Sequence, residues 1–150
     1  MSAQQACTAC RIIRKEIPAY VIAEDAHTIV FLSLENHPVV APKIHIPDIF
    51  ALDEATGALI MQAAIRVAKA VKAGLHCEGV YVTQANGAAA GQSLFHFHLH
   101  IYPRWHDDKL TAYWNTAQAD HELRRLTAER IRTHWAPGAG AVPLQAASVP

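Results

Sequence analysis

Apolar and polar residues alternate most regularly from Phe95 to Ile101, where three histidines separate four large apolar side chains. Successive side chains of an extended strand point to opposite faces, so this pattern predicts a strand with His96, His98 and His100 on one face. On a helix the same rings would scatter around the axis at about 100° per residue. The other face of the strand is expected to pack on a core through Phe95, Phe97, Leu99 and Ile101.

Four shorter runs of apolar or β-branched residues predict the remaining strands. Polar turns at 24–27 and 35–38 separate the first three runs, and Pro103 is expected to end the histidine strand. The four runs are Val21–Ala23, Thr28–Leu32, Val39–Ala41 and Gly79–Thr83.

Apolar positions at three- and four-residue spacing predict one long helix, with Asp53 as its N-cap and Gly74 at its end. A short helix is expected over 7–14, and a heavily charged helix over 118–134. Neighbouring strands that suit antiparallel pairing, together with few helices, favour an α+β fold over a regular β-α-β alternation. The apolar stripe of the long helix is Ile60, Ala64, Val67, Ala68, Val71 and Leu75.

Length and composition indicate one domain with a core of its own, since 51% of the 150 residues are hydrophobic. Residues 1–135 are predicted to form this domain, and the Ala-, Gly- and Pro-rich residues 136–150 a disordered tail. Lysine and arginine total 13, as do aspartate and glutamate, so no basic field suggests nucleic acid.

No apolar stretch approaches the roughly 20 residues that cross a bilayer, so no membrane segment is expected. The first residues have neither the basic start nor the apolar centre of a signal peptide. A cytoplasmic location is therefore the expectation.

A neutral imidazole is a nucleophile toward phosphorus, a proton carrier and a metal ligand. Three histidines in register thus allow two interpretations, covalent catalysis or a metal site built on the strand, and the residues alone leave both open. The loop before the strand adds amides, a hydroxyl and flexible backbone N–H groups, which suit phosphate oxygens. Its relevant residues are Asn86, Gly87, Gly91, Gln92 and Ser93.

Cys7 and Cys10 form a Cys-x-x-Cys pair, which in a reducing compartment indicates a metal or redox site. A closed tetrahedral zinc site would need two more ligands. Candidates are His27, His37, His45 and one strand histidine, and spacing does not choose among them. Cys77 is interpreted as a small, partly buried residue.

The run NGAAAGQSLFHFHLHIYPR, residues 86–104, resembles the signature of the histidine triad family, in which three histidines alternate with apolar residues. Its Ala-Gly-Gln and Tyr-Pro-Arg parts resemble the branch related to diadenosine polyphosphate hydrolases. The upstream runs CTACRIIRKEIPAYVIAED and VAPKIHIPDIFAL also resemble family segments in the same order. The resemblance covers about residues 7–106 and is most specific at the histidines.

The resemblance implies a five-stranded antiparallel sheet with two helices, and a homodimer whose sheets join into ten strands. It implies hydrolysis or transfer at the α-phosphate of a nucleotide, with His98 as the nucleophile that becomes nucleotidylated. His100 would assist His98, and His37 would take the place of a fourth supporting histidine. The implied nucleotide contacts are Phe31 and Leu34 near the base, Asn86 in the phosphate pocket, and Gln92 and Ser93 on phosphate oxygens.

Zinc-bearing members of the family imply a structural zinc ion on Cys7, Cys10, His45 and His96. Ser33 stands where an aspartate of the family usually holds the ribose hydroxyls, and it is expected to contact them as a weaker, uncharged partner. This substitution and a shortened loop at 35–38 are departures from the family. These departures motivate one alternative, a nucleotide-binding regulatory protein with vestigial activity. A zinc hydrolase that uses the strand histidines as ligands is the other.

Overall fold

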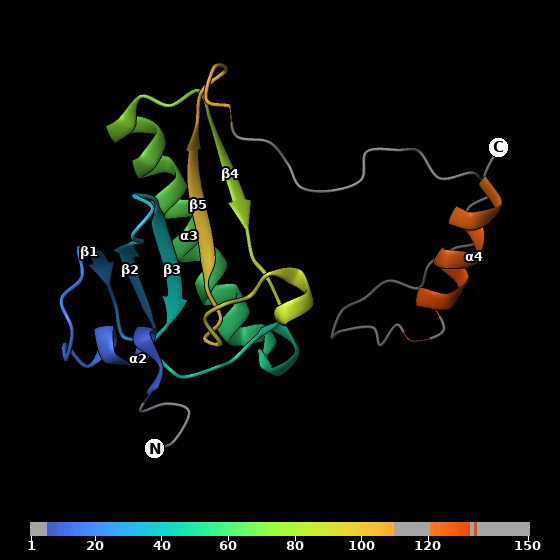
Figure 1. Ribbon diagram of the computed structural model, residues 1–150, viewed down its shortest axis with the longest axis horizontal. Helices are drawn as coiled ribbons and strands as arrows, with labels where there is room; N and C mark the ends of the chain where they lie inside the picture. Colours follow the sequence, from blue (N-terminus) through green and yellow to red (C-terminus); the bar gives the residue numbers. More distant parts are fainter. Residues whose placement is uncertain (1–5, 110–120, 133, 135–150) are drawn as a thin grey trace. The chain divides into compact units, whose positions relative to one another are not determined.

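The computed structural model describes residues 6–109, 121–132 and 134. Contacts divide the chain into two units, residues 1–109 and residues 110–150. The first unit holds a five-stranded antiparallel sheet in the order β1-β2-β3-β5-β4, which confirms the α+β prediction (Figure 1). The strands are β1 (Val21–Glu24), β2 (Thr28–Leu32), β3 (Pro38–Pro42), β4 (Gly79–Thr83) and β5 (Leu99–Arg104).

Helix α3 (Glu54–Leu75) crosses behind the sheet in Figure 1 and begins where the sequence predicts. The Asp53 side chain accepts a hydrogen bond from the Thr56 N–H at 2.9 Å and caps the first turn. The predicted end at Gly74 is one residue short, because the helix continues until His76 adopts a left-handed conformation with φ of 52°.

Both faces of the sheet are covered, and the two layers have different sizes. On the α3 side, Val40, Ile60 and Ile101 are fully or almost fully buried in the larger core. On the other side, helix α2 (Thr8–Ile13) contributes Ile12 and Ile13 to a smaller cluster. That cluster also contains Ile29, Phe31, Val39 and Ala41.

The histidine segment differs from its prediction, because strand β5 begins only at Leu99. Residues 95–98 are irregular, so the three histidines do not form a single row on one strand face. The physical reason is that the His96 ring turns into the interior and approaches the two cysteines of the N-terminal segment. The Phe97 N–H bonds to the Ile46 carbonyl at 2.6 Å, and Phe95 is 49% exposed rather than in the core.

Pro103 lies inside β5 rather than ending it, which corrects a second prediction. The pairing of β3 with β5 involves only Leu99 and His100, whereas β4 pairs with β5 as far as Arg104. At Pro103 the strand therefore has a partner on one side only, where a residue without an N–H is tolerated.

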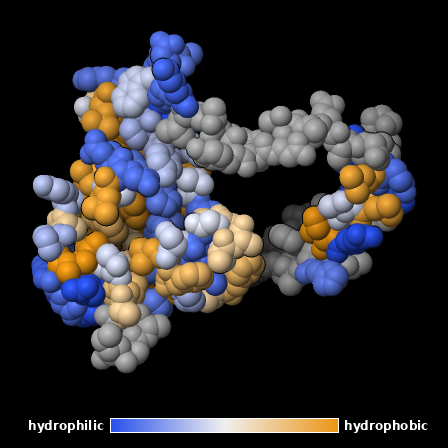
Figure 2. Space-filling view, in the orientation of Figure 1, coloured by the Kyte–Doolittle hydropathy of each residue, from blue (hydrophilic) through white to orange (hydrophobic). Residues whose placement is uncertain are grey.

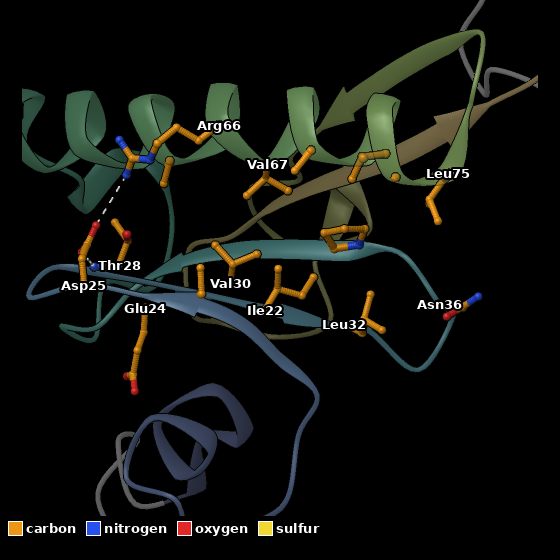
Figure 3. A pocket seen from close by; sticks show the side chains of 16 residues that line it. Ile22, Glu24, Asp25, Thr28, Val30, Leu32, Asn36, Arg66, Val67 and Leu75 are labelled. Carbon is orange, nitrogen blue, oxygen red and sulfur yellow. Dashed lines mark hydrogen bonds and ion pairs between the residues drawn. The ribbon is translucent and has the colours of Figure 1, made fainter.

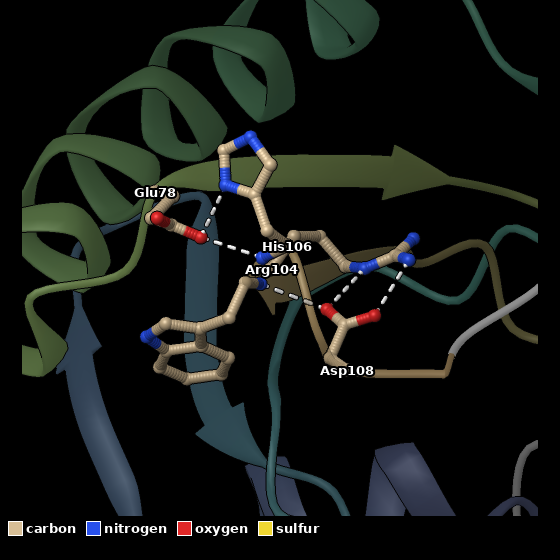
Figure 4. Close-up of polar contacts among 5 residues, drawn as sticks. Glu78, Arg104, His106 and Asp108 are labelled. Atoms are coloured by element: carbon tan, nitrogen blue, oxygen red, sulfur yellow. Dashed lines mark hydrogen bonds and ion pairs between the residues drawn. The ribbon is translucent and has the colours of Figure 1, made fainter.

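An ion pair and a histidine–carboxylate contact lie at the end of β5, and the second reaches Glu78, the residue before β4 (Figure 4). Arg104 donates two hydrogen bonds to the Asp108 carboxylate, at 2.6 and 2.8 Å. The Glu78 carboxylate lies 2.6 Å from Nδ1 of His106 and accepts its backbone N–H at 2.5 Å.

Two short 3-10 helices that the sequence does not predict, Ile49–Ala51 and Ala88–Ala90, lie in the loops.

The second unit contains helix α4 (His121–Arg132), within the predicted charged segment. Its apolar side chains Leu123, Leu126 and Ile131 are exposed. The predicted tail, 136–150, lies outside the described residues, and the single domain over 1–135 stays a prediction.

Figure 2 shows apolar and polar residues interspersed on the visible face of the first unit. No helix among the described residues is both long and apolar enough to span a membrane.

Candidate active site and metal centre

His98 lies just before β5, and one of its ring nitrogens is already engaged. Its Nδ1 is 2.6 Å from the backbone carbonyl oxygen of His96. A carbonyl oxygen only accepts, so Nδ1 carries the proton and donates it. In the neutral ring Nε2 is then the nitrogen with a free lone pair, which is the state that a nucleophile requires.

Two further histidines, His37 and His100, contact each other on the side of the sheet opposite to α3. Nε2 of His37 lies 2.8 Å from Nδ1 of His100. The pairing of Val39 with His100 places β3 and β5 side by side at this point and brings His37 to the ring. The His98 and His100 ring centroids are 4.7 Å apart, so His37, His100 and His98 form one continuous group.

Burial favours the uncharged form of two rings in this group, His37 and His100. Burial and the neighbouring His98 and His37 rings lower the pKa of His100 to about 4. Burial also lowers the pKa of His37, although the charge of Glu35 opposes the shift. A buried imidazolium loses hydration that the interior does not replace, so the neutral form is favoured in both rings.

A groove of about 940 Å³ lies between α2, the segment that follows it, and the end of β2. Phe31, Ser33 and Leu34, which the family resemblance assigns to nucleoside binding, all line it. Phe31 is buried, whereas the Leu34 side chain is fully exposed at the groove. Ile12, Ile17 and Tyr20 supply further apolar surface.

The loop before the histidine segment is held by its own side chains. Oε1 of Gln92 accepts the Gly87 N–H at 2.7 Å, and its Nε2 donates to the carbonyls of Pro47 and Leu94. Gln92 is buried, so here its amide fixes the loop rather than facing solvent. Oδ1 of Asn86 accepts the Ile49 N–H at 2.7 Å, while Ser93 is exposed.

Cys7, Cys10, His45 and His96 gather at one point, as the family resemblance implies. Their four candidate ligand atoms all lie within 4.8 Å of one another. His27 and His37, the other sequence candidates, are not members of this cluster. Nε2 of His96 lies 2.8 Å from the Pro42 carbonyl, so it carries the proton and Nδ1 presents its lone pair to the sulfurs.

The distances in this cluster suit a tetrahedral ion. Sulfur–nitrogen distances are 3.5 Å from Cys7 to His96, 3.5 Å from Cys10 to His96 and 3.4 Å from Cys10 to His45. Zinc bonds of about 2.3 Å to sulfur and 2.1 Å to nitrogen give a tetrahedral edge of about 3.6 Å. Burial and the Cys7 side chain raise the pKa of the Cys10 thiol to about 11, so a cation bound at this point would favour its ionised form.

A second groove, of about 720 Å³, lies between β1, β2 and α3 (Figure 3). Ile22, Val30 and Val67 point into it, and Asp25 pairs with Arg66 at its rim at 3.5 Å. Its lining contains none of the predicted site residues.

Tyr102 belongs to the histidine group, although the sequence interpretation did not include it. Its ring centroid lies 3.9 Å from that of His37 and 5.7 Å from that of His100. The strand pattern could have identified Tyr102, because it lies two residues after His100 and residues two apart on a strand share a face. The carbonyls of His96, Pro42 and Pro47 also matter to the site, but backbone groups leave no mark in a residue pattern.

The HIT domain family model matches residues 14–107 of the chain. The protein Hit of Bacillus subtilis is 32% identical over 131 residues, which cover 84% of this chain and 90% of that protein. An adenosine 5'-monophosphoramidase of Saccharomyces cerevisiae is 33% identical over 84% of this chain and 81% of its own length. An adenylylsulfatase of Arabidopsis thaliana is 31% identical over 73% of this chain and 57% of its own length.

Solved structures agree with these sequence relatives. A HIT family protein from Bacillus anthracis superposes with a TM-score of 0.80 at 33% identity, covering 87% of this chain and 98% of that one. A zinc-bound histidine triad family protein from Mycobacterium smegmatis gives a TM-score of 0.69 at 29% identity, covering 88% and 99%.

The lowered pKa of His100 predicts acid sensitivity of the fold. Between its folded value of about 4 and its ordinary value of 6.5, the unfolded chain binds more protons, so the free energy of unfolding falls as pH falls through this window. The loss from this group is about 3 kcal/mol at most. Urea unfolding at pH 7 and pH 4.5 should show a smaller acid loss for His100→Gln than for the wild type. Equal losses in both proteins would contradict the prediction.

Proposed function

The chain belongs to the HIT domain family, and on that premise we propose that it hydrolyses nucleotides at the α-phosphate through a nucleotidyl group carried on His98. The observation that carries the proposal is the hydrogen bond from Nδ1 of His98 to the His96 carbonyl. It fixes the tautomer whose Nε2 is free to attack. Named relatives act on an adenosine monophosphoramidate and on adenylyl sulfate, two substrates that share the adenylyl group and differ in what leaves.

The proposed reaction has two displacements at phosphorus. In the first, Nε2 of His98 forms a bond to the α-phosphorus, and the bond to the leaving group breaks with its electron pair. The leaving group takes up a proton from solvent as it departs. In the second, water attacks the same phosphorus and loses a proton to solvent. The phosphorus–nitrogen bond breaks with its electron pair returning to Nε2, and the nucleoside monophosphate is released with the neutral His98 ring regenerated.

The neighbouring residues have supporting roles in this proposal. His100 and His37 stay neutral and contribute hydrogen bonds without placing positive charge beside the nucleophile, which would lower its nucleophilicity. Ser93 and the backbone of the loop at 84–92 lie before His96 in the chain and are proposed to contact phosphate oxygens. The apolar groove at Phe31 and Leu34 is proposed to receive the nucleoside.

The two alternatives fit the geometry less well. A zinc hydrolase on the three histidines needs their rings around one ion, whereas the cluster of potential ligands within the described residues contains only His96 of the three. A regulatory nucleotide-binding protein would need no free nucleophilic nitrogen, yet the His98 ring is held in the nucleophilic tautomer.

Replacement of His98 by alanine tests the proposal. Loss of the nucleophile should reduce kcat/KM toward adenosine 5'-phosphoramidate and dinucleoside polyphosphates by about 10⁴-fold or more. His27→Ala is the matched control, because this exposed histidine lies in the turn between β1 and β2. Turnover by a folded His98→Ala protein at the wild-type rate would refute covalent catalysis. Nucleotide binding without turnover in the wild type would favour the regulatory alternative.

We further propose that Cys7, Cys10, His45 and His96 hold a structural zinc ion. The donor set, the distances near 3.5 Å and the bond from His96 to the Pro42 carbonyl support this assignment. The ion would supply charge that ionises both thiols and would join the N-terminal segment to the chain before β5. It would have no position left for substrate, since all four sites of a tetrahedron are filled by the protein.

Zinc removal should therefore lower stability rather than remove the chemistry. A chelator is expected to lower the thermal midpoint of the wild type by roughly 10 °C. Cys77→Ala, a buried cysteine outside the cluster, should keep this chelator response, whereas Cys10→Ser should lose it. One zinc per chain is expected by elemental analysis. A wild-type midpoint unchanged by the chelator would contradict the assignment, and lost turnover in a chain that stays folded would favour a zinc hydrolase.

We also propose a homodimer in which the open edge of β4 pairs with the same strand of a second copy. β4 is regular, with five consecutive pairs to β5, whereas the β1 edge has a register shift at Val21–Ala23 that discourages pairing. Val82 on β4 lies opposite the buried Ile101 but is 43% exposed, so apolar surface remains beside the open edge.

Light scattering on the full chain tests this dimer. The wild type is expected at twice the monomer mass, and Val82→Lys should shift the mass toward the monomer because a charge would be buried in the interface. Val21→Lys, on the opposite edge of the sheet, should leave the dimer intact. A monomeric wild type at micromolar concentration would overturn the proposal.

A further inference from the structure

Ser33 occupies an unusual position among the described polar residues, because its hydroxyl oxygen contacts three nitrogens at once. It accepts the backbone N–H groups of Glu35 at 3.2 Å and of His37 at 3.3 Å. The third contact, 3.0 Å long, reaches Nδ1 of His37. The first two bonds close the short turn between β2 and β3, and the third leads into the histidine group.

In the third contact the proton belongs to the Ser33 hydroxyl, as the number of its lone pairs shows. A serine oxygen has two acceptor sites and one O–H. The two backbone N–H groups occupy both acceptor sites, so the remaining contact is the Ser33 O–H donating to Nδ1 of His37. Since Nδ1 accepts, the neutral His37 ring carries its proton on Nε2. That proton is donated to Nδ1 of His100, 2.8 Å away, and leaves His100 with its own proton on Nε2.

We propose that Ser33 is a positioning residue that sets the tautomers of His37 and His100, so that His100 presents an N–H donor beside the nucleophile. A donor at this point suits an oxygen of a phosphoryl group, which gains negative charge when His98 attacks. Ser33 itself need not touch the ligand. This inference deepens the proposed function and rests on it only for the identity of the acceptor.

The surroundings of His37 leave the reverse arrangement few partners. If Nδ1 carried the proton, it would share the Ser33 oxygen with two backbone donors or turn to the Glu35 carbonyl, which acts to raise the pKa of His37. Oε2 of Glu35 lies 3.9 Å from Nδ1, beyond hydrogen-bond length, and its side chain is 76% exposed. The Tyr102 ring packs on His37 at 3.9 Å between centroids and restricts rotation of the imidazole. The His37 ring is 2% exposed, so solvent does not supply another partner.

The test combines a direct view of the tautomers with kinetics on the full chain. Long-range ¹H–¹⁵N correlation spectra of the ligand-free protein with ¹⁵N-labelled histidine distinguish protonated Nδ1 from protonated Nε2. In the wild type, His37 and His100 should carry their protons on Nε2. Ser33→Ala should shift both rings toward a mixture of tautomers, and Ser33→Thr, which keeps a hydroxyl, should restore the wild-type spectrum.

Asp25→Ala is the matched control for loss of a turn. Oδ1 of Asp25 accepts the N–H groups of His27 and Thr28 in the turn between β1 and β2, at 2.8 and 2.7 Å. This variant should lose stability as Ser33→Ala does, but it should leave the His37 and His100 spectra unchanged.

Kinetics distinguish positioning from binding. Ser33→Ala should lower kcat about 10- to 100-fold, in the range of other outer-shell residues that orient a histidine, with KM changed less than about two-fold. Ser33→Thr should stay close to the wild type. A wild-type His37 protonated on Nδ1, or ring signals that do not move in Ser33→Ala, would overturn the inference. Because the spectra need no turnover, a failure of His98-dependent hydrolysis would appear separately, as unchanged rates in His98→Ala.

Discussion

The Nε2–H of His96 donates to the Pro42 carbonyl, 2.8 Å away, at a point with no solvent exposure. This one contact directs Nδ1 of the same ring toward the two cysteine sulfurs. The peptide carbonyl of His96 in turn accepts from the His98 ring at 2.6 Å. The side chain of His96 thus belongs to the candidate metal cluster, and its backbone belongs to the candidate active site. The two sites consequently share a rigid connection one residue long.

The chemistry of the second histidine group follows from its burial. A nucleophilic imidazole must be neutral, and positive neighbours would draw its lone pair toward themselves. By lowering the pKa of His37 and His100, the interior keeps both rings neutral at physiological pH. The same desolvation makes every hydrogen bond in the group depend on the correct tautomer, because an unpaired buried nitrogen would be costly. Orientation and charge are therefore controlled together.

Much of this arrangement could be predicted from the sequence, and the failures have physical causes. Runs of apolar or β-branched residues located β1 to β4, the alternating pattern located the part of β5 from Leu99, and helical periodicity located α3. The predicted strand over Phe95–His98 was wrong. The buried His96 ring contacts the Cys7 and Cys10 sulfurs, and the backbone around it is irregular rather than extended. The roles of Gln92 and Ser33 depend on which backbone groups lie within reach, and a tertiary contact of this kind has no periodic signal. Tyr102 was detectable by strand periodicity and was missed.

The loop at residues 84–92 has a thermodynamic consequence for any ligand that reaches the histidines. The Gln92 amide makes hydrogen bonds to Gly87, Pro47 and Leu94, and Gly87 and Gly91 both have φ of 82°. The glycines allow this tight path, and the glutamine holds it before a ligand arrives. A loop that is already ordered loses little conformational entropy on binding. Affinity at this end of the sheet should therefore reflect contacts with the ligand almost directly, with only a small deduction for ordering the protein.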